Sequence, residues 1–194
     1  MGRAAVAGIA AIMIVALAGT FLWFRARWRD QASRSPYAGQ LDSPIRGLSP
    51  QEVDDLRGGR GAGFARTAEL NGYPGPRHVL DLRAQMQLAP AQVRRTEAIF
   101  AEMEAEAKRV GDEVLRVEAR LSDAFARGAA SSADVEALTG DAGRLYGQLR
   151  AVHLRAHLQM KAVLSAGQVA RYNEFRGYRS AAAPGGGDHQ HRTH

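Results

Sequence analysis

The chain has 194 residues and no cysteine, which excludes disulfide bonds, thiol chemistry and a lipid anchor on an N-terminal cysteine. Its formal net charge is +6, but residues 88–164 carry 11 acidic and 11 basic side chains, so the long central segment is neutral. Since a basic stripe on one face is missing, we expect no nucleic-acid partner. The sequence also has no nucleophile elbow, HExxH motif or paired catalytic carboxylates, and we expect no enzyme activity.

Residues 4–24 form an uncharged run of about the ~20 residues that cross a bilayer. Trp23 and Phe24 close this run, and arginines follow it, as at a membrane interface. The small residues around Leu17 would also suit signal-peptide cleavage. Because the apolar run extends beyond what a signal peptide needs, the pattern favours an uncleaved anchor within residues 1–30.

The chain after the anchor begins with a polar, turn-rich linker over residues 31–47. Ser49 and Glu52 have the spacing of a capping box, with proline at the first helical position, which predicts a helix start. Glycines at 58 and 59 make this helix short. Two further short helical segments are predicted over residues 64–70 and 77–86, separated by a strong turn.

Two long helices are predicted next, because their apolar residues repeat at heptad spacing. The first helix covers residues 90–127 and ends at Gly128, and Ser131 or Ser132 can cap the second. The seam positions of the first helix are Met103, Ala107, Val110, Val114, Val117 and Leu121. Those of the second are Val135, Leu138, Ala142, Leu145, Leu149, Val152 and Ala156. A short loop between such helices predicts an antiparallel hairpin.

A final short helix is predicted from Ser165 to about Gly177, and the glycine-rich tail over residues 179–194 is predicted to be disordered. The fold class is therefore all-α: an N-terminal transmembrane helix followed by a hooked antiparallel hairpin over residues 48–178. One such hairpin leaves apolar helix surface uncovered, so a homodimer is expected.

Two related pentapeptides bracket the hairpin. Each has a leucine and, four positions later, a glutamine: Leu88 with Gln92, and Leu164 with Gln168. Ser165 is suited to cap a helix while Gln168 reaches back to complete the capping box. The two leucines would fill the junctions between long and short helices.

These pentapeptides resemble the doubled LTXXQ motif of the Spy/CpxP superfamily, although Ala89 stands where that family usually has threonine. The resemblance covers residues 48–178 and is strongest to membrane-anchored heavy-metal sensors of the CnrX type. It implies a single-pass inner-membrane protein whose soluble domain faces the periplasm. The three arginines after Phe24 favour the opposite orientation.

His153 and His157 are four residues apart and share a helix face, a common arrangement for presenting two imidazoles to a transition metal. The heptad register places Glu104 near His153, and Met160 follows His157 by one turn. The resemblance to metal sensors favours His153, His157, Met160 and Glu104 as ligands for Zn, Cu, Ni or Co. At an ordinary histidine pKa near ~6.5, affinity would fall as the pH drops through that value.

A different interpretation of the histidine pair remains open: both residues could lie on the flank of the seam and form ion pairs with glutamates. The histidines of the tail could also hold a metal loosely, at a large entropic cost of ordering.

We therefore expect a periplasmic sensor of metal or envelope stress, or a metal-resistance protein, that signals through a partner protein. The alternative is a Spy-like, ATP-independent chaperone for unfolded proteins.

Overall fold

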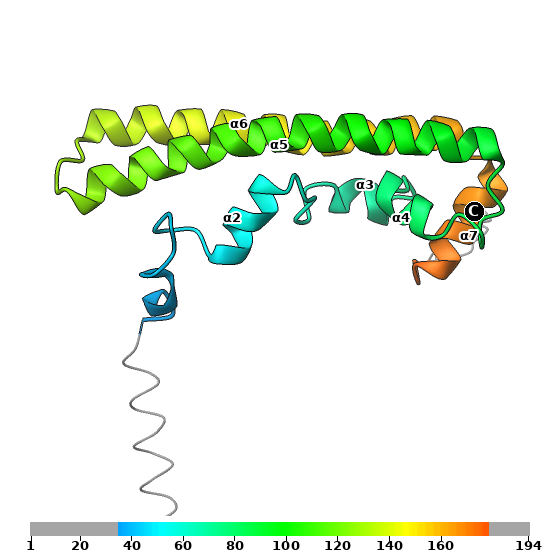
Figure 1. Cartoon of the computed structure of the whole chain (residues 1–194), viewed down its shortest axis with the longest axis horizontal. Coiled ribbons are helices and arrows are strands. Elements are labelled where there is room, and N and C mark those ends of the chain that lie inside the picture. Colours follow the sequence, from blue (N-terminus) through cyan, green and yellow to red (C-terminus); the bar gives the residue numbers. More distant parts are fainter. Residues whose placement is uncertain (1–34, 179–194) are drawn as a thin grey trace, which may run out of the picture. The chain divides into compact units, whose positions relative to one another are not determined.

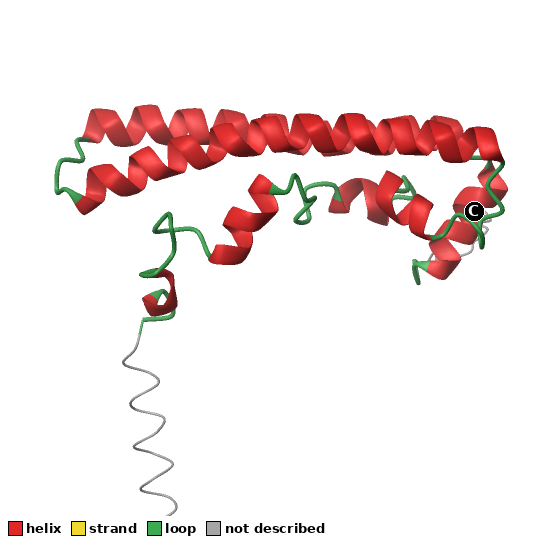
Figure 2. Cartoon of the chain, viewed as in Figure 1, coloured by secondary structure: helices red, strands yellow, loops and turns green. Residues whose placement is uncertain are grey.

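A computed structural model describes residues 35–178 (Figure 1). The chain divides into two compact units, one ending at Ser43 and the other beginning at Pro44. Within the described residues, the first unit contains a single turn of 3-10 helix, η1 (Ala38–Gln40). The second unit contains every other element, and over residues 35–178 the structure is all-helical, as the sequence predicts (Figure 2).

The second unit is built on an antiparallel hairpin of two long helices, α5 (Pro90–Ala126) and α6 (Ser132–Val163). The turn between them uses Gly128 at a φ of +64°, which glycine adopts without strain. The hydroxyl of Ser131 accepts a hydrogen bond from the Asp134 amide, and the Asp134 carboxylate accepts one from the Ser131 amide. Both helix boundaries at this turn agree with the predicted ones to within a residue.

The heptad seam forms the main core. Of the thirteen predicted seam residues, ten are buried and the other three, Met103, Leu121 and Val135, are half-buried. Ile45, Leu48, Val53 and Leu56 pack against the same seam from the N-terminal side. The folded unit therefore begins slightly earlier than the predicted boundary at residue 48, because Ile45 already belongs to the core.

Four short helices accompany the hairpin within residues 44–178. Helices α2 (Pro50–Arg57), α3 (Arg66–Leu70) and α4 (Pro76–Asp81) run in a row along it, and α7 (Ala166–Phe175) turns back at its end (Figure 1). The predicted capping box of α2 is present. Helix α4 is shorter than the predicted 77–86, because it ends at Asp81 and residues 82–87 form turns that lead towards α5, with Gln87 at a φ of +52°.

Near α7 lies a second core cluster. Its members are Val79, Met86, Ile99, Ala156, Met160, Leu164, Val169 and Tyr172. Leu88 is half-buried against this cluster, so both pentapeptide leucines fill the junction that the sequence assigns to them.

The two pentapeptide glutamines bond to each other across this end of the hairpin. Gln92 accepts from the Ala89 amide at 3.0 Å, and Gln168 accepts from the Ser165 amide at 3.0 Å. The side-chain nitrogen of Gln92 donates to Gln168 Oε1 at 2.9 Å. Each glutamine thus caps its own helix while it joins the other helix start.

No helix within residues 35–178 is long and apolar enough to cross a membrane. The predicted anchor (residues 1–30) and the tail (residues 179–194) lie outside the described residues.

Helix α2 lies so close to α5 that Gly111 has no room for a side chain. A Cβ there would overlap the carbonyl oxygen of Leu56, which is backbone and cannot rotate away. We expect Gly111→Ala to lower the free energy of unfolding by about 1–3 kcal/mol, the usual effect of overpacking.

Gly143→Ala is the matched control, since a Cβ at Gly143 meets nothing within 4 Å and alanine raises helix propensity. Chemical denaturation followed by circular dichroism measures both variants. Equal stability of the two would contradict the close approach of α2.

Candidate functional site

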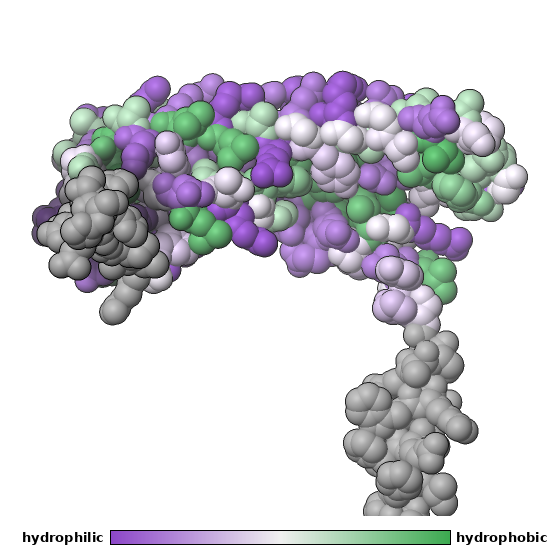
Figure 3. Space-filling model, turned by 180° about the vertical axis from the view of Figure 1, so that it is seen from behind, coloured by the Kyte–Doolittle hydropathy of each residue, from purple (hydrophilic) through white to green (hydrophobic). Residues whose placement is uncertain are grey.

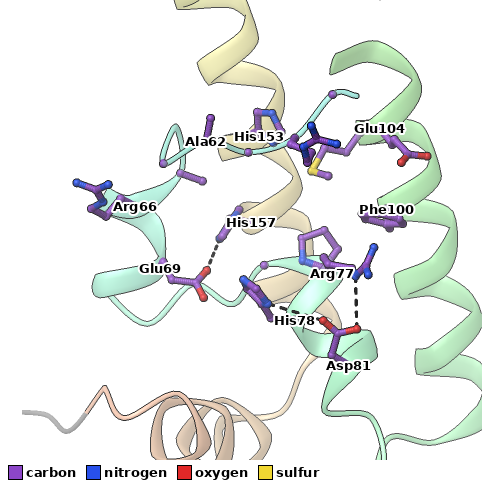
Figure 4. A pocket seen from close by; sticks show the side chains of 18 of the residues that line it. Ala62, Arg66, Glu69, Arg77, His78, Asp81, Phe100, Glu104, His153 and His157 are labelled. Atoms are coloured by element: carbon purple, nitrogen blue, oxygen red, sulfur yellow. Dashed lines mark ion pairs between the residues drawn. The ribbon is translucent and has the colours of Figure 1, made fainter. Parts of the chain in front are cut away.

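A cavity of about 660 Å³ lies between the row of short helices and the hairpin. Figure 4 shows lining side chains from α3, α4, α5, α6 and the glycine-rich loop over residues 58–63; those of Arg66 and Glu104 point away from the two histidines. Its titratable lining residues are Arg60, Arg66, Glu69, Arg77, His78, Asp81, Glu104, His153, His157, Arg176 and Tyr178. The cavity therefore brings together three histidines and three carboxylates from distant parts of the sequence.

His153 lies on α6 and is buried, with 3% of its surface exposed. Its ring stacks on Phe64 at a centroid distance of 5.9 Å and an interplanar angle of 10°. Its Nε2 is buried and has no hydrogen-bond partner among the described residues. Burial, with a smaller contribution from His157, lowers the pKa of His153 from 6.5 to about 4. The imidazole is therefore neutral at physiological pH.

His157 lies one turn further along α6 and is also buried. Its Nδ1 donates to the carbonyl oxygen of Tyr73 at 2.7 Å and lies 3.6 Å from Glu69 Oε2 (Figure 4). A neutral ring that donates through Nδ1 keeps its lone pair on Nε2. Metal-bound histidines in proteins are oriented by the same kind of bond from the second nitrogen.

Gly75 makes the approach to His157 possible. A Cβ at this position would lie 2.9 Å from His157 Cε1 and 3.3 Å from Glu69 Oε2. The turn between α3 and α4 therefore needs a residue without a side chain in order to close over the imidazole.

Glu69 is the centre of a hydrogen-bond network at the end of the cavity nearest α7. Its Oε1 accepts from the Tyr172 hydroxyl and lies 3.5 Å from Arg176 Nε. Tyr172 is fully buried, and burial together with the bond to Glu69 raises the pKa of its hydroxyl. A phenol that stays protonated continues to donate to the carboxylate, so Glu69 connects α3 to α7 as well as to His157.

His78 reaches the cavity from α4 and is half-exposed, with its Nδ1 3.9 Å from Asp81 Oδ2 (Figure 4). Burial and the nearby Arg176 lower its pKa, so this imidazole also favours the neutral form. Arg77, its neighbour, forms an ion pair with Asp81 at 3.4 Å.

Three of the four predicted ligands line this cavity, and the fourth does not. His153, His157 and Glu104 line the same cavity, although Glu104 forms an ion pair with Lys108 at 3.3 Å. Met160 does not line the cavity but lies fully buried in the second core cluster. In the part of the chain that the structure describes, no three His, Asp or Glu side chains are close enough to hold one ion.

Three cavity residues were not predicted as ligands from the sequence: Glu69, Asp81 and His78. Their positions depend on where α3 and α4 pack against the hairpin, and the heptad register carries no information about that. The glycine–proline turn between these helices was the one sequence signal that the chain reverses there.

Comparisons with protein-family models, curated proteins and solved structures found no match to this chain.

The lowered pKa of His153 predicts how stability depends on pH. The unfolded chain takes up this proton near 6.5 and the folded chain only near 4, so acidification through this window favours unfolding. We expect His153 to reduce the free energy of unfolding by on the order of 3 kcal/mol once the pH has fallen below both values.

His153→Phe removes the titrating group and retains stacking on Phe64. Denaturation at pH 7, 5.5 and 4 should show a smaller loss of stability in the variant than in the wild type. Parallel loss in both proteins would show that His153 is not buried in its neutral form.

Proposed function

We propose that the cavity binds a divalent transition metal through His153 and His157, and that the protein is a membrane-anchored sensor of metal or envelope stress. The observation that carries this proposal is a pair of buried imidazoles one helical turn apart on one cavity wall. One has a buried Nε2 without a partner among the described residues, and the other is oriented through Nδ1 by a backbone carbonyl.

The donor set suits borderline metals such as Zn, Cu, Ni and Co, which bind neutral imidazoles well. The low pKa of His153 favours binding, because no proton has to be displaced from it at neutral pH. A third ligand has to come from a side chain that moves. His78 and Glu104 are both partly exposed cavity residues, whereas Met160 is held in the core.

Calorimetric titration of the full chain with Zn, Cu, Ni and Co tests this proposal. We expect His153→Ala and His157→Ala each to weaken binding by about tenfold or more, since each removes a direct ligand from a small set. Met160→Leu is the control and should bind as the wild type does. The contribution of His153 should persist to about pH 5, because its pKa is about 4 and not near 6.5.

A double His153→Ala, His157→Ala variant that titrates like the wild type would refute the proposal. The two histidines would then be buried polar residues, and any binding would come from elsewhere, including the histidines of the tail. Deletion of residues 185–194 separates that contribution.

The resemblance to the Spy/CpxP superfamily supports an inner-membrane, single-pass location with the helical unit in the periplasm. A fusion after His194 tests this placement. Alkaline phosphatase at that position should be active and green fluorescent protein dark, because the first needs the periplasm and the second the cytoplasm. The reverse pattern would show that the arginines after residue 24 determine the orientation.

The Spy-like chaperone remains the second candidate, favoured by exposed apolar side chains at Leu70, Leu158 and Phe175, which are 54–61% exposed. Suppression of client aggregation without ATP, in a chain that binds no metal, would favour it over the sensor.

A further inference from the structure

A second hollow lies between α3 and α6, separate from the histidine cavity. It is an apolar groove of about 340 Å³, formed by Thr67, Ala68, Asn71, Tyr73, Leu154 and Leu158. Leu158, which α6 contributes to the groove, is 59% exposed. None of the groove residues belongs to the lining of the histidine cavity.

Both ends of the groove carry a positive charge. At one end, Arg150 Nη2 lies 3.5 Å from the Thr67 hydroxyl. At the other, Lys161 Nζ donates to the Gly72 carbonyl at 3.0 Å and lies over the ring of Tyr73. Helix α6 has no acidic residue from position 142 to its end, so nothing on this helix neutralises these cations.

The side of α6 that carries Leu154 and Leu158 continues towards the start of the helix through Gly147, Gly143 and Gly140, which follow at helical spacing. A Cβ at any of these positions would meet nothing within 4 Å. Each glycine in a helix interior costs about 0.8–1 kcal/mol relative to alanine, and no contact within the described chain requires it. Figure 3 shows the unit from behind, with apolar and strongly polar residues interspersed over its surface.

We propose that this groove docks an acidic amphipathic helix of a partner protein. Leucine-like side chains of that helix enter between Leu154 and Leu158, and its carboxylates pair with Arg150 and Lys161. This is the usual helix-in-groove mode, with anchors at positions i, i+3 or i+4, and i+7. The flat glycine segment lets the backbone of the docked helix approach α6 closely.

The charge pattern separates this partner from two other occupants. A second copy placed groove to groove in antiparallel fashion would bring Arg150 of one chain against Lys161 of the other, which is repulsive. An anionic membrane would satisfy the cations, but a concave groove beside a glycine segment offers it little apolar contact. The docking site does not depend on metal binding at the histidine cavity.

One labelled variant distinguishes all three occupants. Because the chain has no cysteine, Asn71→Cys supplies a unique thiol in the groove wall for an environment-sensitive dye. The full chain, in phosphatidylcholine nanodiscs, is titrated with a synthetic helical peptide of about 18 residues, roughly 27 Å long. The peptide has leucine at every third or fourth position and glutamate elsewhere, and the comparison peptide has lysine in place of glutamate.

We expect the acidic peptide to shift the dye emission to the blue and the basic peptide to leave it unchanged. Leu158→Gln should weaken peptide binding by about tenfold, because it removes a large apolar contact. Arg150→Gln should weaken it less and reduce its dependence on salt. Phe125→Gln is the matched control, an exposed apolar side chain at the opposite end of the hairpin, and should change nothing.

Three results would overturn the proposal. The first is unspecific contact. It would be shown by equal binding of the acidic and basic peptides, or by an equal loss of peptide affinity in Leu158→Gln and Phe125→Gln. The second is a blue shift with phosphatidylglycerol vesicles but not with the acidic peptide, which would assign the groove to a membrane. The third is a shift in nanodiscs with two chains, without peptide, which would assign it to a second copy.

Discussion

The apolar seam between α5 and α6 is the interaction on which the other parts of the helical unit depend. Its residues are buried by each other, and the short helices have too few apolar side chains to form a core without it. Helix α2 docks where Gly111 allows backbone to approach backbone. At the other end, the glutamines of the two pentapeptides join the start of α5 to the start of α7. The hairpin thus provides a rigid wall against which less stable segments are placed.

Helix α3 lines the histidine cavity on one side and the apolar groove on the other. Its Glu69 faces the histidine cavity and connects His157 to Tyr172, while Thr67 and Ala68 form one side of the apolar groove. The helix is only five residues long, so its position depends on these contacts more than on its own backbone bonds. A shift of α3 would therefore alter both hollows.

The buried imidazole of His153 has a nitrogen atom without a hydrogen-bond partner among the described residues. A buried polar atom without a partner is unfavourable, and in native proteins such an atom commonly serves a function or binds a water molecule or an ion. Stacking on Phe64 holds the ring in place, and burial keeps it neutral. Both effects would favour His153 as a ligand for the metal proposed above. The same features determine how the metal-free protein responds to acid.

The sequence by itself determined the elements whose signals are local or periodic. The heptads of α5 and α6 predicted the seam, and the i, i+4 spacing placed His153 and His157 on one face. The capping residues marked the helix starts at Ser49, at Ser131 or Ser132, and at Ser165. A helix carries this information in its own residues, because its period and its caps do not depend on distant contacts.

Only the tertiary structure decided what surrounds those elements. Met160 shares a helix with the two histidines yet enters the core, because α4 and α7 cover it. Glu69 and His78 enter the cavity, because the turn at Gly75 folds α3 and α4 back against α6. These placements come from the packing of short helices with weak periodicity, separated by turns that contain glycine. Their side chains are directed by long-range contacts that no local pattern encodes.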